Sequence, residues 1–289
     1  VRPIARPARS AGTTVRCALI VCPPRSGGTV IYQALTQAIP CVYLCNAHAL
    51  LPGWGTRIQR AKRAALAERQ SFNNYCGYTG SLADVYEGNE FFAWMHRPPG
   101  RNGDEAAHLC REFDLLIRLL APRPPECVIL KNARAFSKIA RLHEAIPEIV
   151  LVRVRRETDQ VIQSAVRAYR DLGTFHPVPE SLRKQNIDDP IEFAYQQIRA
   201  IEASLDEQLS QVAPECRLEI PYEAFCGDPH RFIRTLACDR LGLAPGSLRE
   251  CAALSRLRPS RRPKVSEAES RQIEELIRHG RSGGGHGLE

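Results

Sequence analysis

The segment Cys17–Leu35, with the sequence CALIVCPPRSGGTVIYQAL, most constrains the fold of this 289-residue chain. It opens with a short apolar run that is typical of a strand covered on both faces in a parallel sheet. Two prolines end this run, and Gly27 and Gly28 let the backbone turn tightly into a helix that opens at Thr29. The unpaired amides and dipole of that helix and the Arg25 guanidinium would converge on one point. The segment therefore predicts a site for a phosphate or sulfate group.

The spelling of this loop differs from two common nucleotide-binding motifs. The ATP/GTP loop requires a Lys immediately before its Ser or Thr, which Thr29 lacks, and the G-x-G-x-x-G fingerprint is also absent. Residues 24–29, PRSGGT, instead resemble the loop P-[RK]-S-G-T-[ST] of sulfotransferases that use 3′-phosphoadenosine 5′-phosphosulfate (PAPS). Gly28 replaces the usual Thr, which we expect to remove one hydroxyl contact. Taken alone, the six residues also fit a glycine-rich turn that binds nothing.

A second segment, Val150–Tyr169, resembles the part of these enzymes that binds the 3′-phosphate of the donor. The family places an Arg at a strand end and a Ser eight residues later on the next helix, and Arg156 and Ser164 keep this spacing. A guanidinium can donate to two phosphate oxygens while a hydroxyl donates to a third. Lys131, which follows the predicted strand Cys127–Leu130, resembles the family's catalytic Lys.

The resemblance extends to the carboxyl-terminal third of the chain and covers roughly residues 17–278. Residues 216–242 resemble the family's late strand, its Tyr-Glu turn and a helix that opens at Asp228 and Pro229. The basic residues 256–264 lie where the family has a loop over the nucleotide, so the resemblance implies that they assist at the 3′-phosphate. The candidates there are Arg258, Arg261 and Arg262.

The order of predicted strands and helices indicates an α/β fold, with helices on both faces of a central parallel sheet. The resemblance implies the three-layer, P-loop nucleoside-kinase-like version of this architecture. We expect a basic arm over residues 1–16, a sulfotransferase domain over 17–279 with an acceptor-side insertion at 71–103, and a disordered glycine-rich tail over 280–289. Eight of the 19 aromatic residues fall between Trp54 and Trp94, where they could contact a substrate or form a small hydrophobic cluster.

Composition limits the partners and the compartment. The net charge of +8 and the pI near 9.0 indicate anionic partners. The 11 cysteines are odd in number and show no paired metal-site spacing, Cys41 and Cys45 included, so a reduced, cytoplasmic protein without a structural zinc is expected. No apolar run reaches the ~20 residues of a membrane helix, although a lumenal domain of an anchored enzyme stays an alternative.

The resemblance implies transfer of a sulfuryl group from PAPS to a hydroxyl or amine of a small-molecule, glycan or peptide acceptor. No metal is required, because positioning and cationic groups can stabilise this in-line displacement. The expected phosphosulfate contacts are Arg25, Ser26, Gly27, Gly28, Thr29 and Lys131. A kinase-like nucleotide-binding enzyme and, less well supported, a basic nucleic-acid-binding protein are the alternatives.

The general base is where this sequence departs from the family. Some members use a Glu soon after the second strand, whereas the cytosolic animal enzymes use a His two residues after the catalytic Lys. That second position is Ala133 here, which cannot accept a proton. We expect the second strand at residues 41–44, which are apolar. The loop after it has no Glu but contains His48, whose ordinary pKa of about 6.5 suits a base at neutral pH. We therefore expect His48 to be the base, with His96 as the reserve candidate.

Overall fold

The computed structural model describes residues 15–51, 58, 72, 74, 79–89, 92–93, 104–120, 127–260 and 263–282. Several expectations fall on other residues and so lie outside the described part. They concern residues 1–14 of the basic arm, Trp54, most of the insertion at 71–103 including Trp94 and His96, and the tail beyond Ser282. Arg261 and Arg262 also lie outside the described part.

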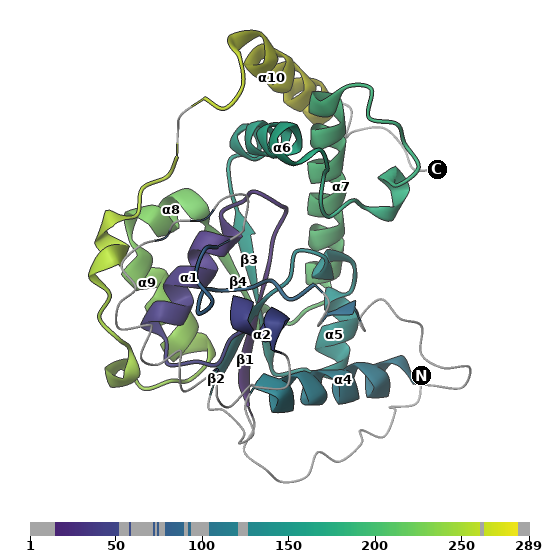
Figure 1. Ribbon diagram of the computed structural model, residues 1–289. Coiled ribbons are helices and arrows are strands. Elements are labelled where there is room, and N and C mark those ends of the chain that lie inside the picture. The colour runs from purple at the N-terminus through teal and green to yellow at the C-terminus, as the bar shows by residue number, and fades with distance from the viewer. Residues whose placement is uncertain are drawn as a thin grey trace.

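A four-stranded parallel sheet forms the centre of the fold (Figure 1). Its strands are β1 (Arg16–Val21), β2 (Cys127–Lys131), β3 (Ile149–Arg155) and β4 (Arg217–Pro221), in the order β2-β1-β3-β4. The predicted parallel sheet is confirmed. The strand expected at residues 41–44 is reduced to isolated bridges, Val42 with Val128 and Cys45 with Val85.

Helices cover both faces of this sheet, and two of them begin close to the predicted positions, α1 at Gly28 and α9 at Pro229. The helices are α1 (Gly28–Ala38), α2 (Asn46–Leu50), α4 (Glu105–Leu120), α5 (Ile139–Ala145), α6 (Thr158–Leu172), α7 (Pro190–Ser210), α8 (Tyr222–Gly227), α9 (Pro229–Arg234) and α10 (Glu267–Ser282). As predicted, Asp228 caps α9 by accepting from the Arg231 amide at 3.1 Å, and Ser266 with Glu269 forms a capping box before α10. A π-helical turn, Thr235–Arg240, continues α9.

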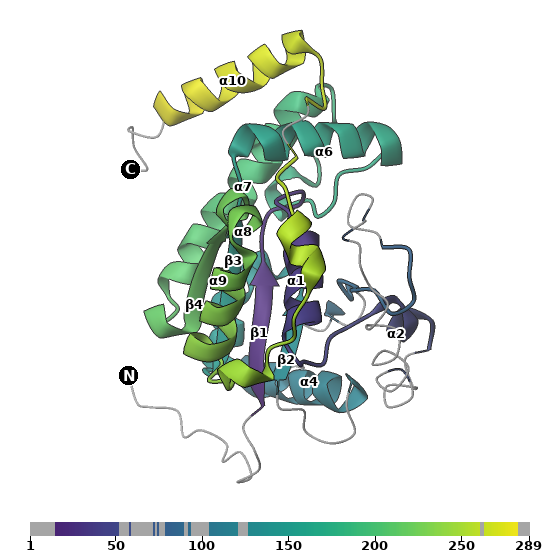
Figure 2. The ribbon, with the colours of Figure 1, turned by 90° about the vertical axis from the view of Figure 1, so that its left-hand side faces the viewer.

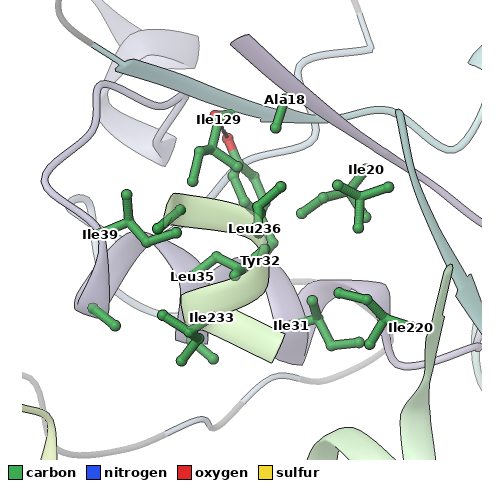
Figure 3. Packing of buried hydrophobic residues seen from close by; sticks show 14 of the residues in the cluster. Ala18, Ile20, Ile31, Tyr32, Leu35, Ile39, Ile129, Ile220, Ile233 and Leu236 are labelled. Carbon is green, nitrogen blue, oxygen red and sulfur yellow. Dashed lines mark hydrogen bonds between the residues drawn. The ribbon is translucent and has the colours of Figure 1, made fainter. Parts of the chain in front are cut away.

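Alternation along the strands divides the core between the two faces of the sheet. Ala18 and Ile20 of β1 face α1, α8 and α9, and Leu19 and Val21 face α4, α5 and α7. Figure 3 shows the first of these clusters, in which Tyr32 of α1 reaches the sheet and its hydroxyl donates to the Ile129 carbonyl at 3.1 Å. Burial on both faces explains why β1 and β2 read as uninterrupted apolar runs.

A third cluster lies beyond the carboxyl ends of the strands, where α6, α7 and α10 pack together (Figures 1 and 2). The first half of α7 contributes Phe193 and Ile198 to this cluster, and its second half contributes Ile201 and Leu205 to the core below. α7 therefore connects the helices above the strand ends to the sheet. This leaves a space between α6 and the strand ends, which is where open α/β folds bind ligands.

Candidate active site

A cavity of about 770 Å³ lies at the carboxyl ends of β1 and β2, beneath α6. The β1–α1 loop, the end of β2, the segment 79–89, α6 and the loop after α6 all contribute to its wall. Predicted site residues that line it are Arg25, Gly27, Gly28, Thr29, Lys131, Arg156 and Ser164. The structure thus brings two segments that are more than 120 residues apart in the sequence to one cavity.

The β1–α1 loop has a strained backbone that fits a ligand-binding turn. Arg25 has a φ of 69° and Gly27 a φ of 86°, both in the left-handed region. A side chain at Gly27 has no room, because a Cβ atom there would lie 2.2 Å from the ring of Tyr222. The first intrahelical bond of α1 runs from the Ile31 amide to the Gly27 carbonyl at 3.1 Å, so the preceding amides of the first turn face the loop.

Gly28 has a steric role that the sequence did not reveal. A Cβ atom at this position would lie 2.6 Å from Cys22 Sγ and 2.8 Å from Lys131 Cε. The Thr that is common at this place in the family would therefore collide with both side chains. Burial raises the pKa of the Cys22 thiol to about 11, so this neighbour is an uncharged packing group at neutral pH.

Replacing Gly28 with Thr is expected to destabilise the protein by about 1–3 kcal/mol, the usual cost of overpacking. Gly246→Thr is the matched control, because a Cβ at Gly246 meets nothing within 4 Å, and its cost should stay within about 0.5 kcal/mol. Urea denaturation of both variants measures the difference. Equal stabilities would show that Cys22 and Lys131 adjust freely around a larger residue.

Lys131 ends β2 with its side chain buried, and it forms an ion pair with Glu87 of the segment 79–89. Both residues line the cavity. Asn132 holds this segment in place, because its Nδ2 approaches the Glu87 carbonyl oxygen at 3.4 Å and Asn89 Oδ1 at 3.3 Å. A carboxylate and an ammonium group are thus adjacent at the strand ends, where one can accept a proton and the other can stabilise negative charge.

The segment that carries Glu87 is fixed to the rest of the fold. Asp84 is buried, and its Oδ1 accepts from Gln33 Nε2 of α1 at 3.0 Å and from the Val85 amide at 2.8 Å. The Tyr86 amide donates to the Leu44 carbonyl at 3.0 Å. The helix that begins at the β1–α1 loop therefore also positions Glu87.

Glu87 was missed by sequence reasoning because it lies in the irregular insertion, more than 40 residues beyond the segment 41–44. The family's Glu was expected soon after that segment. The sequence Tyr86-Glu87-Gly88-Asn89 shows no periodicity from which one could predict that Glu87 faces a cavity. In the same insertion, Tyr86 lines the cavity and Phe92 joins the core, so each interpretation of its aromatic residues holds for one residue.

His48 lies elsewhere. It is fully buried and is not among the residues that line the cavity. Its Nδ1 accepts from the Cys45 amide at 3.0 Å and lies 3.1 Å from Cys45 Sγ, which closes the first turn of α2. The structure therefore gives His48 a capping role in α2 and does not place it where a base would act.

Arg25, Arg156 and Ser164 meet at one end of the cavity. Arg25 Nε donates to Ser164 Oγ at 3.2 Å, and Arg156 donates to the Arg25 carbonyl at 3.3 Å and to the Ser260 carbonyl at 3.0 Å. The Arg156 side chain is only 6% exposed and stacks over the Tyr222 ring, 4.8 Å from its centroid. These contacts hold the guanidinium against the loop at which an anion is expected.

Lys264 adds a further cation at this end. Burial, together with repulsion by Arg156, Arg25 and Arg167, lowers the pKa of its ammonium group to about 8. Several like charges held together out of water favour the binding of an anion between them. Arg258, in contrast, donates to the Ser255 and Leu257 carbonyls and does not line the cavity. Lys264 lies within the predicted basic segment 256–264 but was not among the candidates selected there, Arg258, Arg261 and Arg262.

The fold and the site define an α/β enzyme with an anion-binding strand-to-helix loop and a carboxylate–ammonium pair at the strand ends. Residues 18–245 match the model of the sulfotransferase family, and the chain belongs to that family.

Two bacterial sulfotransferases of known structure share the fold. STF1 from Mycobacterium tuberculosis superposes with a TM-score of 0.57 at 12% identity, over 92% of this chain and 77% of that one. STF9 from Mycobacterium avium gives 0.55 at 13% identity, over 93% of this chain and 69% of that one. No curated protein matches the sequence.

Among the described residues, no three His, Cys, Asp or Glu side chains gather in a way that could bind a metal ion. Each helix in the same part of the chain is too short or too polar to cross a membrane.

Proposed function

We propose that this sulfotransferase transfers a sulfuryl group from PAPS to a hydroxyl or amine group of its acceptor, with Glu87 as the general base. The observation that carries the proposal is that the two ends of one cavity are lined by different chemical groups. Arg25, Arg156 and Lys264 make one end cationic, and the Glu87–Lys131 pair makes the other fit for proton transfer.

The cationic end fits a nucleotide that bears a 3′-phosphate. Arg156 and Ser164 would donate to this phosphate, and Lys264, which lines the same cavity, would add an ammonium group. The amides of the first turn of α1 and Arg25 would bind the 5′-phosphosulfate. The lowered pKa of Lys264 supports this assignment, because a bound dianion would relieve the repulsion among the cations.

The donor supplies an activated sulfuryl group whose leaving group is a nucleotide phosphate. Glu87 would take the proton of the acceptor hydroxyl as the new O–S bond forms. Lys131 would stabilise the negative charge that grows on the bridging oxygen as the old S–O bond breaks. Their ion pair holds the two groups next to each other at the strand ends.

Calorimetric titration with 3′-phosphoadenosine 5′-phosphate (PAP), magnesium ATP and a single-stranded oligonucleotide tests this function. PAP, the product of the donor, is expected to bind most tightly of the three. Tightest binding of ATP would favour the kinase-like alternative, and tightest binding of the oligonucleotide would favour a nucleic-acid-binding protein.

The affinity for PAP is expected to fall as the pH rises from 7 to 9.5. Bound phosphate raises the pKa of Lys264 above the value of about 8 in the free protein. Below pH 8 the ammonium group is therefore already protonated before PAP binds, and the affinity is highest. Above pH 8, binding must take up a proton and weakens by up to about tenfold per pH unit until the bound-state pKa is passed. The phosphate itself stays a dianion over this range, because its second pKa is about 6.

Calorimetry in buffers of different ionisation enthalpy measures the proton uptake, and Lys264→Met should abolish it. Uptake that persists in this variant would assign the effect to another group.

A further inference from the structure

Gln197 of α7 is fully buried, yet it lines the cavity. Its Nε2 donates to the carbonyl oxygen of Pro177, and this bond fixes the orientation of the amide because a carbonyl can only accept. The other end of the amide, Oε1, has no hydrogen-bond partner among the described residues. Buried carbonyl oxygens are normally paired, so this atom points to a ligand that supplies a donor.

Gln197 belongs to the Glu87 end of the cavity. Pro177, its partner, follows His176, which also lines the cavity. Burial and Arg134 lower the pKa of His176, and Glu87 lies close enough to oppose them. The ring of His176 is therefore neutral at pH 7, and its Nε2 accepts from Arg134 Nε at 3.0 Å. Glu87, His176, Pro177 and Gln197 thus form one stretch of wall at which the acceptor would lie.

Asn46, Asn74, Thr79 and Asn89 also line the cavity. Part of each side chain is paired within the protein: Asn46 and Asn74 donate to backbone carbonyls, the Thr79 hydroxyl donates to the Val85 carbonyl, and the Asn89 oxygen accepts from Asn132. Amide and hydroxyl side chains can each donate and accept, as sugar hydroxyls do.

We propose that the acceptor is polyhydroxylated, with one hydroxyl reacting at Glu87 and a second hydroxyl of the same molecule donating to Gln197 Oε1. The inference rests on the proposed function and names the substrate class of the same site. An acceptor with a single hydroxyl would leave Gln197 Oε1 unpaired, and an anionic acceptor would meet two oxygen acceptors, Glu87 and Gln197. A site built around a substrate hydroxyl discriminates strongly against analogues that lack it.

The test compares sulfation of matched acceptors with PAPS as donor, measured as PAP release. Methyl glucoside, methyl galactoside and methyl mannoside are the polyhydroxylated probes, and cyclohexylmethanol and p-nitrophenol are the monohydroxylated ones. The best glycoside is expected to exceed both monohydroxylated probes in kcat/KM by about 100-fold or more.

Variants of Gln197 separate substrate contact from a structural role. Gln197→Met should lower kcat/KM for the glycoside at least tenfold more than it lowers kcat/KM for cyclohexylmethanol. Gln197→Glu should retain glycoside activity at low pH, because a protonated carboxyl can donate to Pro177 and keep an oxygen toward the cavity. Gln196→Met is the matched control, because Gln196 pairs with Glu192 at 3.1 Å and does not line the cavity.

Three results would overturn the inference: a monohydroxylated probe as the better acceptor, an equal loss for both acceptor classes in Gln197→Met, or no glycoside turnover by a protein that binds PAP. Each of these leaves the donor assignment intact. A protein that does not bind PAP at all would instead overturn the proposed function.

Discussion

Glu87→Gln is expected to lower turnover by about 10²–10⁴-fold, the contribution of a positioned general base, while PAP affinity stays within about threefold. Glutamine has the size of glutamate and can still accept a hydrogen bond from Lys131, but it cannot take a proton at neutral pH. Steady-state kinetics with the best acceptor and calorimetry with PAP measure the two quantities. The loss should appear in kcat, because the base acts only as the acceptor bond forms.

Two controls show whether the effect belongs to the base. Glu105→Gln removes a half-buried carboxylate of α4 that pairs with Lys138 at 3.2 Å and does not line the cavity, and it should leave turnover unchanged. His48→Ala should retain most of the turnover of any protein that stays folded, because His48 does not line the cavity. A Glu87→Gln enzyme with near-wild-type turnover would remove Glu87 from the role, and a severe specific loss in folded His48→Ala would return the role to that histidine.

Arg156→Ala is expected to weaken PAP binding by about 10- to 150-fold, which corresponds to the 1.5–3 kcal/mol of a charged hydrogen bond. The guanidinium lies against the β1–α1 loop and Tyr222, so the replacement removes a donor whose direction is already fixed. Adenosine 5′-phosphate (AMP), which lacks the 3′ group, should bind the variant and the wild type alike.

Arg155→Ala is the control for Arg156. Arg155 is the preceding residue, but it is exposed, pairs with Asp206 and Glu219 at 3.4 Å, and does not line the cavity. Its replacement should leave PAP affinity within about twofold, as is usual for surface ion pairs. Equal losses of PAP affinity in the two variants would indicate general electrostatic attraction rather than a 3′-phosphate site.

Much of the fold follows from local sequence signals. The apolar runs of β1, β2 and β3 are buried on both faces, so their composition alone identifies them as strands of a parallel sheet. The helices begin at recognisable caps such as Asp228 and Ser266. The segment 41–44 was predicted as a strand because it is apolar, but its only ladder contact within the sheet is a single bridge to Val128. Its apolar residues pack into the core without a continuous ladder.

Some residues of the site are likewise placed by local sequence signals, and others by contacts between distant segments. Arg25, Ser164, Arg156 and Lys131 lie at strand ends or on the helix that follows, where topology fixes their positions. The position of Glu87 depends on the contacts of Asp84 with Gln33 and of Tyr86 with Leu44, which join segments that no sequence period connects. Lys264 acquires its lowered pKa from residues that lie far away in the chain. Tertiary packing, rather than residue spacing, sets these parts of the site.

The central claim is that the cationic end of the cavity recognises a 3′-phosphate, and one comparison tests it directly. The wild-type protein should be titrated at pH 7 with PAP and with AMP in the same buffer. Tighter binding of PAP by at least about tenfold is expected, because Arg156, Ser164 and Lys264 would each contact the 3′ group. Equal affinities for the two nucleotides would contradict the account.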